Sequence, residues 1–91
     1  MGSKLISEAM EKNYFTSLQT DTRTEIAWNY GEIITTVETK DYYISLLLLD
    51  NFYVEILIDR YTNELIEIGI QDDDDVLYEY IKDVGINSIK N

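Results

Sequence analysis

The sequence predicts a single α+β domain over residues 1–91, in which an N-terminal and a C-terminal helix pack on a four-stranded antiparallel β-meander. Apolar residues recur at helical spacing near both ends of the chain, and from Glu25 to Gln71 they follow a period of two instead. The chain has no proline and only four glycines, which favours regular elements joined by short turns. Its 91 residues are enough for one hydrophobic core and too few for two.

The first element is an amphipathic helix predicted from Lys4 to about Asn13. Its apolar residues lie on one face at helical period, and Ser3 can cap its start; they are Leu5, Ile6, Ala9 and Met10. The following stretch, Thr16 to Thr24, is rich in threonine, serine and aspartate and predicts a loop, although its first residues could still be helical.

Four strands follow, each rich in the β-branched and aromatic residues that suit a pleated surface. They are predicted at Ile26 to Thr39, Tyr42 to Leu49, Phe52 to Arg60 and Glu64 to Gln71. The separators are short enough for hairpins, so consecutive strands should be neighbours in the sheet. Gly31 can divide the first segment, leaving Glu32 to Thr39 as the strand and Trp28 in a preceding arm or bulge.

The last element is a helix with sequence signals at both ends. Asp72 is expected as its N-cap, followed by three further aspartates in the first turn, where the helix dipole favours anions. Gly85 is expected as the left-handed residue that ends it. One apolar face lies between these ends, made of Val76, Leu77, Tyr80, Ile81 and Val84.

The alternation within the third and fourth strands predicts which sheet face is the core. The two purely apolar sets should lie on one face under the helices; they are Phe52, Val54, Ile56 and Ile58, with Ile66, Ile68 and Ile70. The opposite face is expected to carry an aromatic and aliphatic centre with an acidic rim, which is typical of a protein-binding patch. This candidate interaction site consists of Tyr53, Glu55, Leu57, Asp59, Leu65 and Glu67.

An alternative arrangement remains open, in which the helices lie on opposite faces of the sheet. The exposed patch would then be lost, and Leu46, Leu48 and Leu57 would become core residues.

The charge is the most unusual global property, with 18 acidic residues against 7 basic ones and a net charge of −11. It is concentrated in the second half, where the residues from Asp50 onward carry a net charge of −8. Such a charge repels nucleic-acid phosphates and anionic membrane surfaces, so we expect neither as a partner. A basic protein partner is favoured instead.

The residue types exclude most catalytic chemistry. Histidine and cysteine are both absent, which rules out Ser-His-Asp catalysis, thiol catalysis and imidazole or thiolate zinc sites, and no glycine-rich phosphate loop occurs. A carboxylate pair could do acid–base work only in a cleft, for which one small sheet has little room. We therefore predict no enzyme, no catalytic residue and no cofactor. The run Asp72 to Asp75 lacks the spacing of a calcium loop, so capping is favoured over a metal site.

The sequence thus predicts a small acidic protein-interaction domain, of the inhibitor or immunity-protein type, that binds a basic partner. A structural domain that self-associates is the main alternative, suggested by the strand Tyr42 to Leu49, which is apolar on both sides. A small-ligand carrier is a third. Without a visible signal segment or a membrane-span-length apolar run, a cytoplasmic location is expected. The composition, rich in Ile, Asn, Asp and Glu, favours an AT-rich bacterial or phage genome.

Overall fold

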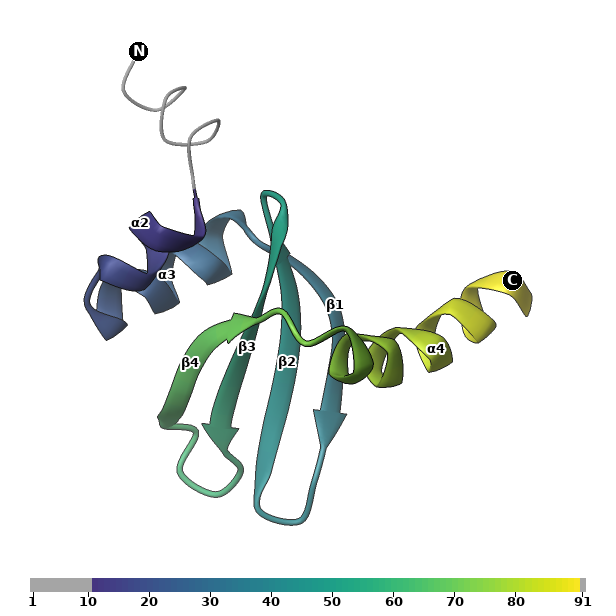
Figure 1. Ribbon diagram of the computed structural model, residues 1–91. Coiled ribbons are helices and arrows are strands. Elements are labelled where there is room, and N and C mark those ends of the chain that lie inside the picture. Colours follow the sequence, from purple (N-terminus) through teal and green to yellow (C-terminus); the bar gives the residue numbers. More distant parts are fainter. Residues whose placement is uncertain (1–10, 91) are drawn as a thin grey trace.

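The computed structural model describes the backbone of residues 11–90 and the side chains of residues 11–82. Its strands form one antiparallel sheet in the order β1-β2-β3-β4, flanked by helices, and this confirms the predicted α+β meander (Figure 1). The elements are α2 (Lys12–Ser17), α3 (Thr20–Tyr30), β1 (Glu32–Glu38), β2 (Tyr42–Leu49), β3 (Phe52–Asp59), β4 (Leu65–Gln71) and α4 (Asp74–Lys90).

The chain before β1 differs from the prediction. The helix expected from Lys4 lies mostly outside the described residues. The loop expected at Thr16 to Thr24 is reduced to residues 18–19, since α2 runs to Ser17, as the prediction allowed for its first residues, and α3 begins at Thr20. The arm or bulge expected around Trp28 is wrong, because α3 includes that residue. Phe15 in α2 and Ala27 in α3 are fully buried, so packing on the sheet stabilises helices that local propensity disfavours.

The threonines that suggested a loop are accommodated by bonding back to the helix. The hydroxyl of Thr16 donates to the Lys12 carbonyl at 2.8 Å, and that of Thr24 donates to the Thr20 carbonyl at the same distance. Such i−4 bonds satisfy the hydroxyl group within a helix. Threonine therefore lowers helix propensity here without preventing the helix.

Gly31 makes the direct passage from α3 into β1 possible. Its N–H donates to the Ala27 carbonyl at 2.8 Å, which closes the last turn of α3. A Cβ at this position would lie 2.5 Å from the Ala27 oxygen and 3.2 Å from Cδ2 of Leu47. The absence of a side chain thus lets the end of α3 approach β2 closely.

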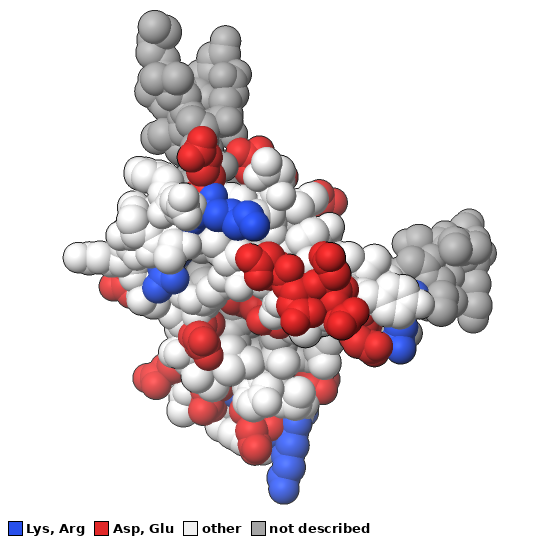
Figure 2. All heavy atoms as spheres, viewed as in Figure 1, with Lys and Arg blue, Asp and Glu red and all other residues white. Residues whose placement is uncertain are grey.

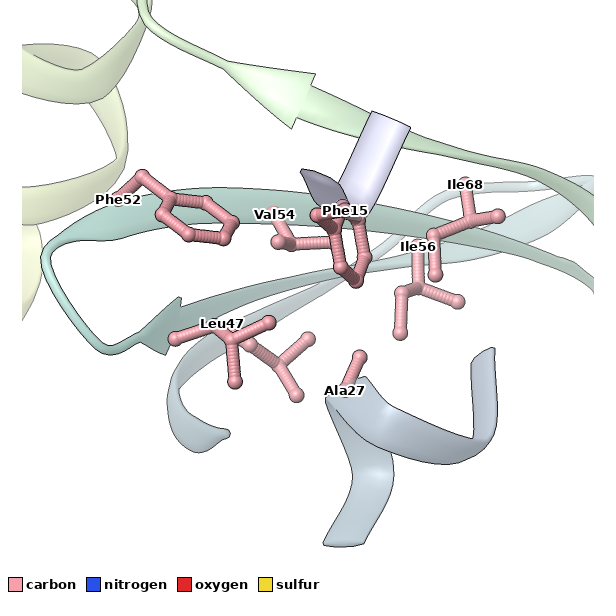
Figure 3. Packing of buried hydrophobic residues seen from close by; sticks show 8 residues of the cluster. Phe15, Ala27, Leu47, Phe52, Val54, Ile56 and Ile68 are labelled. Carbon is pink, nitrogen blue, oxygen red and sulfur yellow. The ribbon is translucent and has the colours of Figure 1, made fainter. Parts of the chain in front are cut away.

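The main core lies between the sheet and the helices α2 and α3, on what we call the α2/α3 face. Phe15 packs on Phe52 with ring centroids 5.6 Å apart. The placement of Phe52, Val54, Ile56 and Ile68 in this core confirms the prediction for them (Figure 3). The full cluster of buried residues is Phe15, Ala27, Leu47, Leu49, Phe52, Val54, Ile56 and Ile68.

Helix α4 lies on the other side of the sheet, the α4 face. Thr35 and Val37 of β1 line a small cavity together with Val76 and Tyr80 of α4, and α4 runs across β1 and past the sheet edge (Figure 1). The helices therefore occupy opposite faces, the second of the two arrangements left open above. Leu46, which projects to the α4 face, is accordingly fully buried. Leu48 and Leu57 on the same face are only half-buried, so the expectation that all three become core residues holds for Leu46 alone.

Strand β4 contains an irregularity that changes which residues share a face. Glu67 pairs with Leu57, but Leu65 pairs with Ile58, because the register shifts between these two β3 residues. Leu65 consequently packs against the main core, contrary to the prediction that it shares a face with Glu67. Ile66, predicted to be core, is 51% exposed.

Both predicted ends of the last helix need correction. Asp73, not Asp72, is the N-cap, since its Oδ1 accepts the N–H groups of Asp75 at 2.9 Å and Val76 at 3.2 Å. The backbone remains helical through Gly85 to Lys90. A glycine lowers helix stability by only about 1 kcal/mol relative to alanine, so it need not end a helix.

Candidate functional site

A hollow opens on the part of the α4 face that α4 leaves uncovered, over β3 and β4. It has a volume of about 170 Å³ and is lined by Ile44, Glu55, Leu57, Glu67, Gly69 and Ile70. Gly69 pairs directly with Glu55 across β3 and β4, so both face the same side. A Cβ at Gly69 would meet no atom within 4 Å. We call this the Gly69 hollow, since the missing side chain leaves it open.

Glu55 forms a fixed acidic wall of the Gly69 hollow. One carboxylate oxygen accepts a hydrogen bond from Nε2 of Gln71 at 2.9 Å, and the other accepts one from the Tyr80 hydroxyl at 2.5 Å. Burial, and then the bond to Glu55, raise the pKa of Tyr80 far above its ordinary value, so the phenol stays a neutral donor. These two bonds tie Glu55 to the end of β4 and to α4.

Glu67 is a second carboxylate at the hollow, and it is free. Glu67 is exposed, and its carboxylate has no hydrogen bond or ion pair with any residue that the structure describes. It is the diagonal neighbour of Glu55 across the two strands, a relation that places such residues about 7–8 Å apart. The hollow therefore combines one held and one free carboxylate with the aliphatic side chains of Ile44 and Leu57.

Further acidic side chains gather beside the hollow, where β4 passes into α4. Asp72 to Asp75 are all exposed, and Figure 2 shows acidic atoms concentrated at this junction. The ammonium nitrogen of Lys12 lies 3.7 Å from Oδ2 of Asp72, and that of Lys82 lies 3.0 Å from Oε1 of Glu79 in α4. No basic side chain lines the Gly69 hollow itself. Its local potential is therefore negative.

The six residues of the predicted interaction site do not form one patch. Glu55, Leu57 and Glu67 come together at the Gly69 hollow. Tyr53 lies on the same face, half-buried and paired with Gln71, but does not line the hollow. Leu65 lies on the α2/α3 face, as described above.

Asp59 has a local role at the far end of β3. Its Oδ1 accepts the backbone N–H groups of Tyr61 at 2.8 Å and Thr62 at 3.0 Å. The bond from Thr62, and then that from Tyr61, hold the pKa of Asp59 below its ordinary value. The carboxylate thus stabilises the turn between β3 and β4 and does not face the hollow.

Sequence reasoning missed two features of the hollow. Gly69 carried a usable signal, because a glycine between two isoleucines inside a strand often marks a close approach of another group. The bond between Tyr80 and Glu55 carried none, since it joins residues of α4 and β3 through the tertiary fold.

Other chemistry finds little support in the described part of the chain. No three acidic side chains converge there as a metal site would require, and none of its helices is long and apolar enough to cross a membrane. A second cavity, of about 240 Å³, lies between α4 and β1.

Comparisons of the chain with protein-family models, with curated proteins and with solved structures find no match. A function for this chain is therefore argued from the geometry and charge of the site.

Proposed function

We propose that this chain is a small acidic protein-interaction domain that binds a basic partner protein, as inhibitors and immunity-type proteins do. The observation that carries the proposal is the open part of the α4 face, where Glu55 and Glu67 lie in a hollow that no basic side chain lines. The aspartates 72–75 extend this negative surface toward α4. The net charge of −11 adds a long-range attraction for a basic protein.

The composition of the surface also suits a protein partner. Interfaces combine an apolar centre with a polar rim, and complementary charge sets their orientation and association rate. Leu57 and Ile44 provide aliphatic area in the hollow, and the carboxylates of Glu55 and Glu67 lie beside it. Drug-sized ligands occupy pockets of about 300–1,000 Å³, so a hollow of about 170 Å³ favours protein side chains over a small-molecule ligand.

A binding screen tests the proposal. The chain is immobilised and exposed to basic nucleases, other basic domains and acidic control proteins, at about 0.05 M and about 0.5 M salt, since screening is much stronger at the higher concentration. We expect at least one basic protein to bind, with an association rate that falls steeply as salt rises. Failure of every basic protein to bind, or binding that salt leaves unchanged, would contradict the proposal.

Self-association is the second candidate, favoured by the exposed edge strand β1, where Ile33 is 55% exposed and Val37 40% exposed. Two copies would each carry a net charge of −11, which opposes their association at low salt. Light scattering at both salt concentrations separates the candidates. A monomer at both supports a binder of other proteins, and a dimer at both supports self-association.

A further inference from the structure

We infer that the Gly69 hollow receives one arginine side chain of the basic partner, with its aliphatic stem over Gly69 and its guanidinium group between Glu55 and Glu67. This inference rests on the proposed function and narrows it to an anchoring contact. Interfaces commonly owe most of their affinity to a few such residues, and arginine is enriched among them.

The lining of the hollow matches the two parts of an arginine side chain. Long basic side chains bury their methylene groups on apolar surface and keep the charged end at a polar boundary. Ile44 and Leu57 offer that apolar surface beside the bare backbone of Gly69. The carboxylates of Glu55 and Glu67 are placed to take the charged end.

The two carboxylates favour arginine over lysine. A guanidinium group carries five donors in a planar fork, whereas an ammonium group is a compact point charge. Each oxygen of Glu55 already accepts one hydrogen bond, and a carboxylate has about four acceptor positions, so capacity remains. Glu67 has no described partner and is free to turn toward the incoming group. A guanidinium group can therefore donate to both carboxylates at once, whereas an ammonium group reaches both less well.

Gly69 supports the inference because the fold does not need a glycine there. Its φ is not positive, and a side chain would meet open space. Gly31 is the contrast, since a Cβ there would lie 2.5 Å from a backbone oxygen. Glycine inside a strand weakens it. A residue that lowers stability without a structural need, at the base of an acidic hollow, fits a role in admitting a partner's side chain.

A second copy of the chain is a poor occupant of the hollow. It carries seven basic residues against eighteen acidic ones, so the approach of two copies is repulsive. The negative potential around the hollow instead complements a partner of positive charge. The occupant is therefore assigned to a basic protein.

The test uses N-acetyl-arginine amide as the probe and follows the backbone amide signals of the isotope-labelled chain by NMR. We expect saturable shifts at Leu57, Glu67 and Gly69, weaker shifts with the lysine analogue, and none with the citrulline analogue, which has nearly the same shape without the charge. Shifts confined to Asp72 to Asp75, or equal shifts with the citrulline analogue, would overturn the inference.

Three variants sharpen the test. Gly69→Leu fills the hollow and leaves the net charge unchanged, so the saturable shifts should disappear. Glu67→Gln removes the free carboxylate and should weaken binding about tenfold. Glu25→Gln removes one exposed charge on α3 and should change affinity less than about twofold. Equal binding by Gly69→Leu and the unaltered chain, or equal losses in Glu67→Gln and Glu25→Gln, would overturn the inference.

The same variants separate this inference from the proposed function. A basic protein found in the screen that binds the unaltered chain and Gly69→Leu equally would overturn the arginine anchor but leave the proposed function intact. A screen without any basic binder would contradict the proposed function, whatever the arginine probe shows. The amide spectrum of β2 and β3 in Gly69→Leu reports whether its fold is retained.

Discussion

The two faces of the sheet differ in what covers them and in what holds the covering in place. On the α2/α3 face, apolar side chains from helices and strands form one continuous buried cluster. On the α4 face, α4 lies over part of β1, and a hydrogen bond from Tyr80 to Glu55 reaches the centre of the sheet. One face therefore supplies most of the stability, and the other retains polar groups and open surface that can bind a partner.

The largest effect that tests this contrast is expected at Phe15. Phe15→Ala removes a fully buried ring that packs on Phe52, and such truncations cost about 3–5 kcal/mol of unfolding free energy. Tyr14→Ala is the matched control, because Tyr14 is the neighbouring residue and is 52% exposed. Urea unfolding followed by circular dichroism measures both. Similar costs for the two variants would mean that α2 does not dock as described.

Gly31, just before β1, and Gly69, inside β4, should respond oppositely to alanine. Gly31→Ala forces a Cβ against the Ala27 carbonyl oxygen, which is backbone and cannot move aside cheaply. We expect a loss of about 1–3 kcal/mol, the range typical of overpacking. Gly69→Ala adds a methyl group in open space and should leave stability unchanged or raise it by up to about 1 kcal/mol. Thermal and urea unfolding of both variants provides the comparison.

The strand pattern shows how far sequence alone reaches. The strict alternation from Phe52 to Ile58 predicted the core face of β3 correctly, because side chains on a regular strand must alternate. The same rule placed Leu65 and Ile66 wrongly, because a register shift at the start of β4 reverses the faces. Alternation is therefore informative only as far as the ladder is regular.

The helices show a different limit. The Thr-rich residues of α3 have weak helical propensity, and its packing on the sheet through Ala27 and Ile26 accounts for the helix. The side of the sheet on which α4 lies depends likewise on tertiary contacts. Glu55, Leu57 and Glu67 could be grouped from sequence, since they share a face of the sheet, but the hollow that they line depends also on Gly69 and on α4 leaving this part of the face uncovered.

A smaller effect is expected on the α4 face at Tyr80. Tyr80→Phe removes the donor to one Glu55 oxygen and should cost about 1 kcal/mol at neutral pH. Folding raises the pKa of Tyr80 above its ordinary value of 10.0. The contribution of the phenol is therefore complete below about pH 10 and is lost as the pH rises further.

The difference in unfolding free energy between the unaltered chain and Tyr80→Phe measures this contribution. It should be constant from pH 7 to about pH 9 and should shrink above pH 10. All other ionisable side chains are the same in both proteins, so their effects on this difference cancel. A difference that is independent of pH up to about 12 would show that neither burial nor the bond to Glu55 raises the pKa of Tyr80 in solution.

The smallest effect is expected at Asp59, which belongs to neither covering layer. Its carboxylate accepts the N–H groups of Thr62 and Tyr61, which lowers its pKa below the ordinary 3.8. The turn that Asp59 stabilises contains Tyr61, whose hydroxyl donates to the Lys40 carbonyl at 3.1 Å. This bond joins the β3–β4 turn to the β1–β2 turn.

Because folding lowers the pKa of Asp59, the stabilisation is complete above about pH 4 and is lost as the pH falls through the pKa of the folded state. Thermal unfolding should show Asp59→Asn less stable than the unaltered chain at pH 7, with a difference that shrinks toward pH 2. If the difference in unfolding temperature between the unaltered chain and Asp59→Asn is the same at pH 2 as at pH 7, the carboxylate charge does not stabilise the turn.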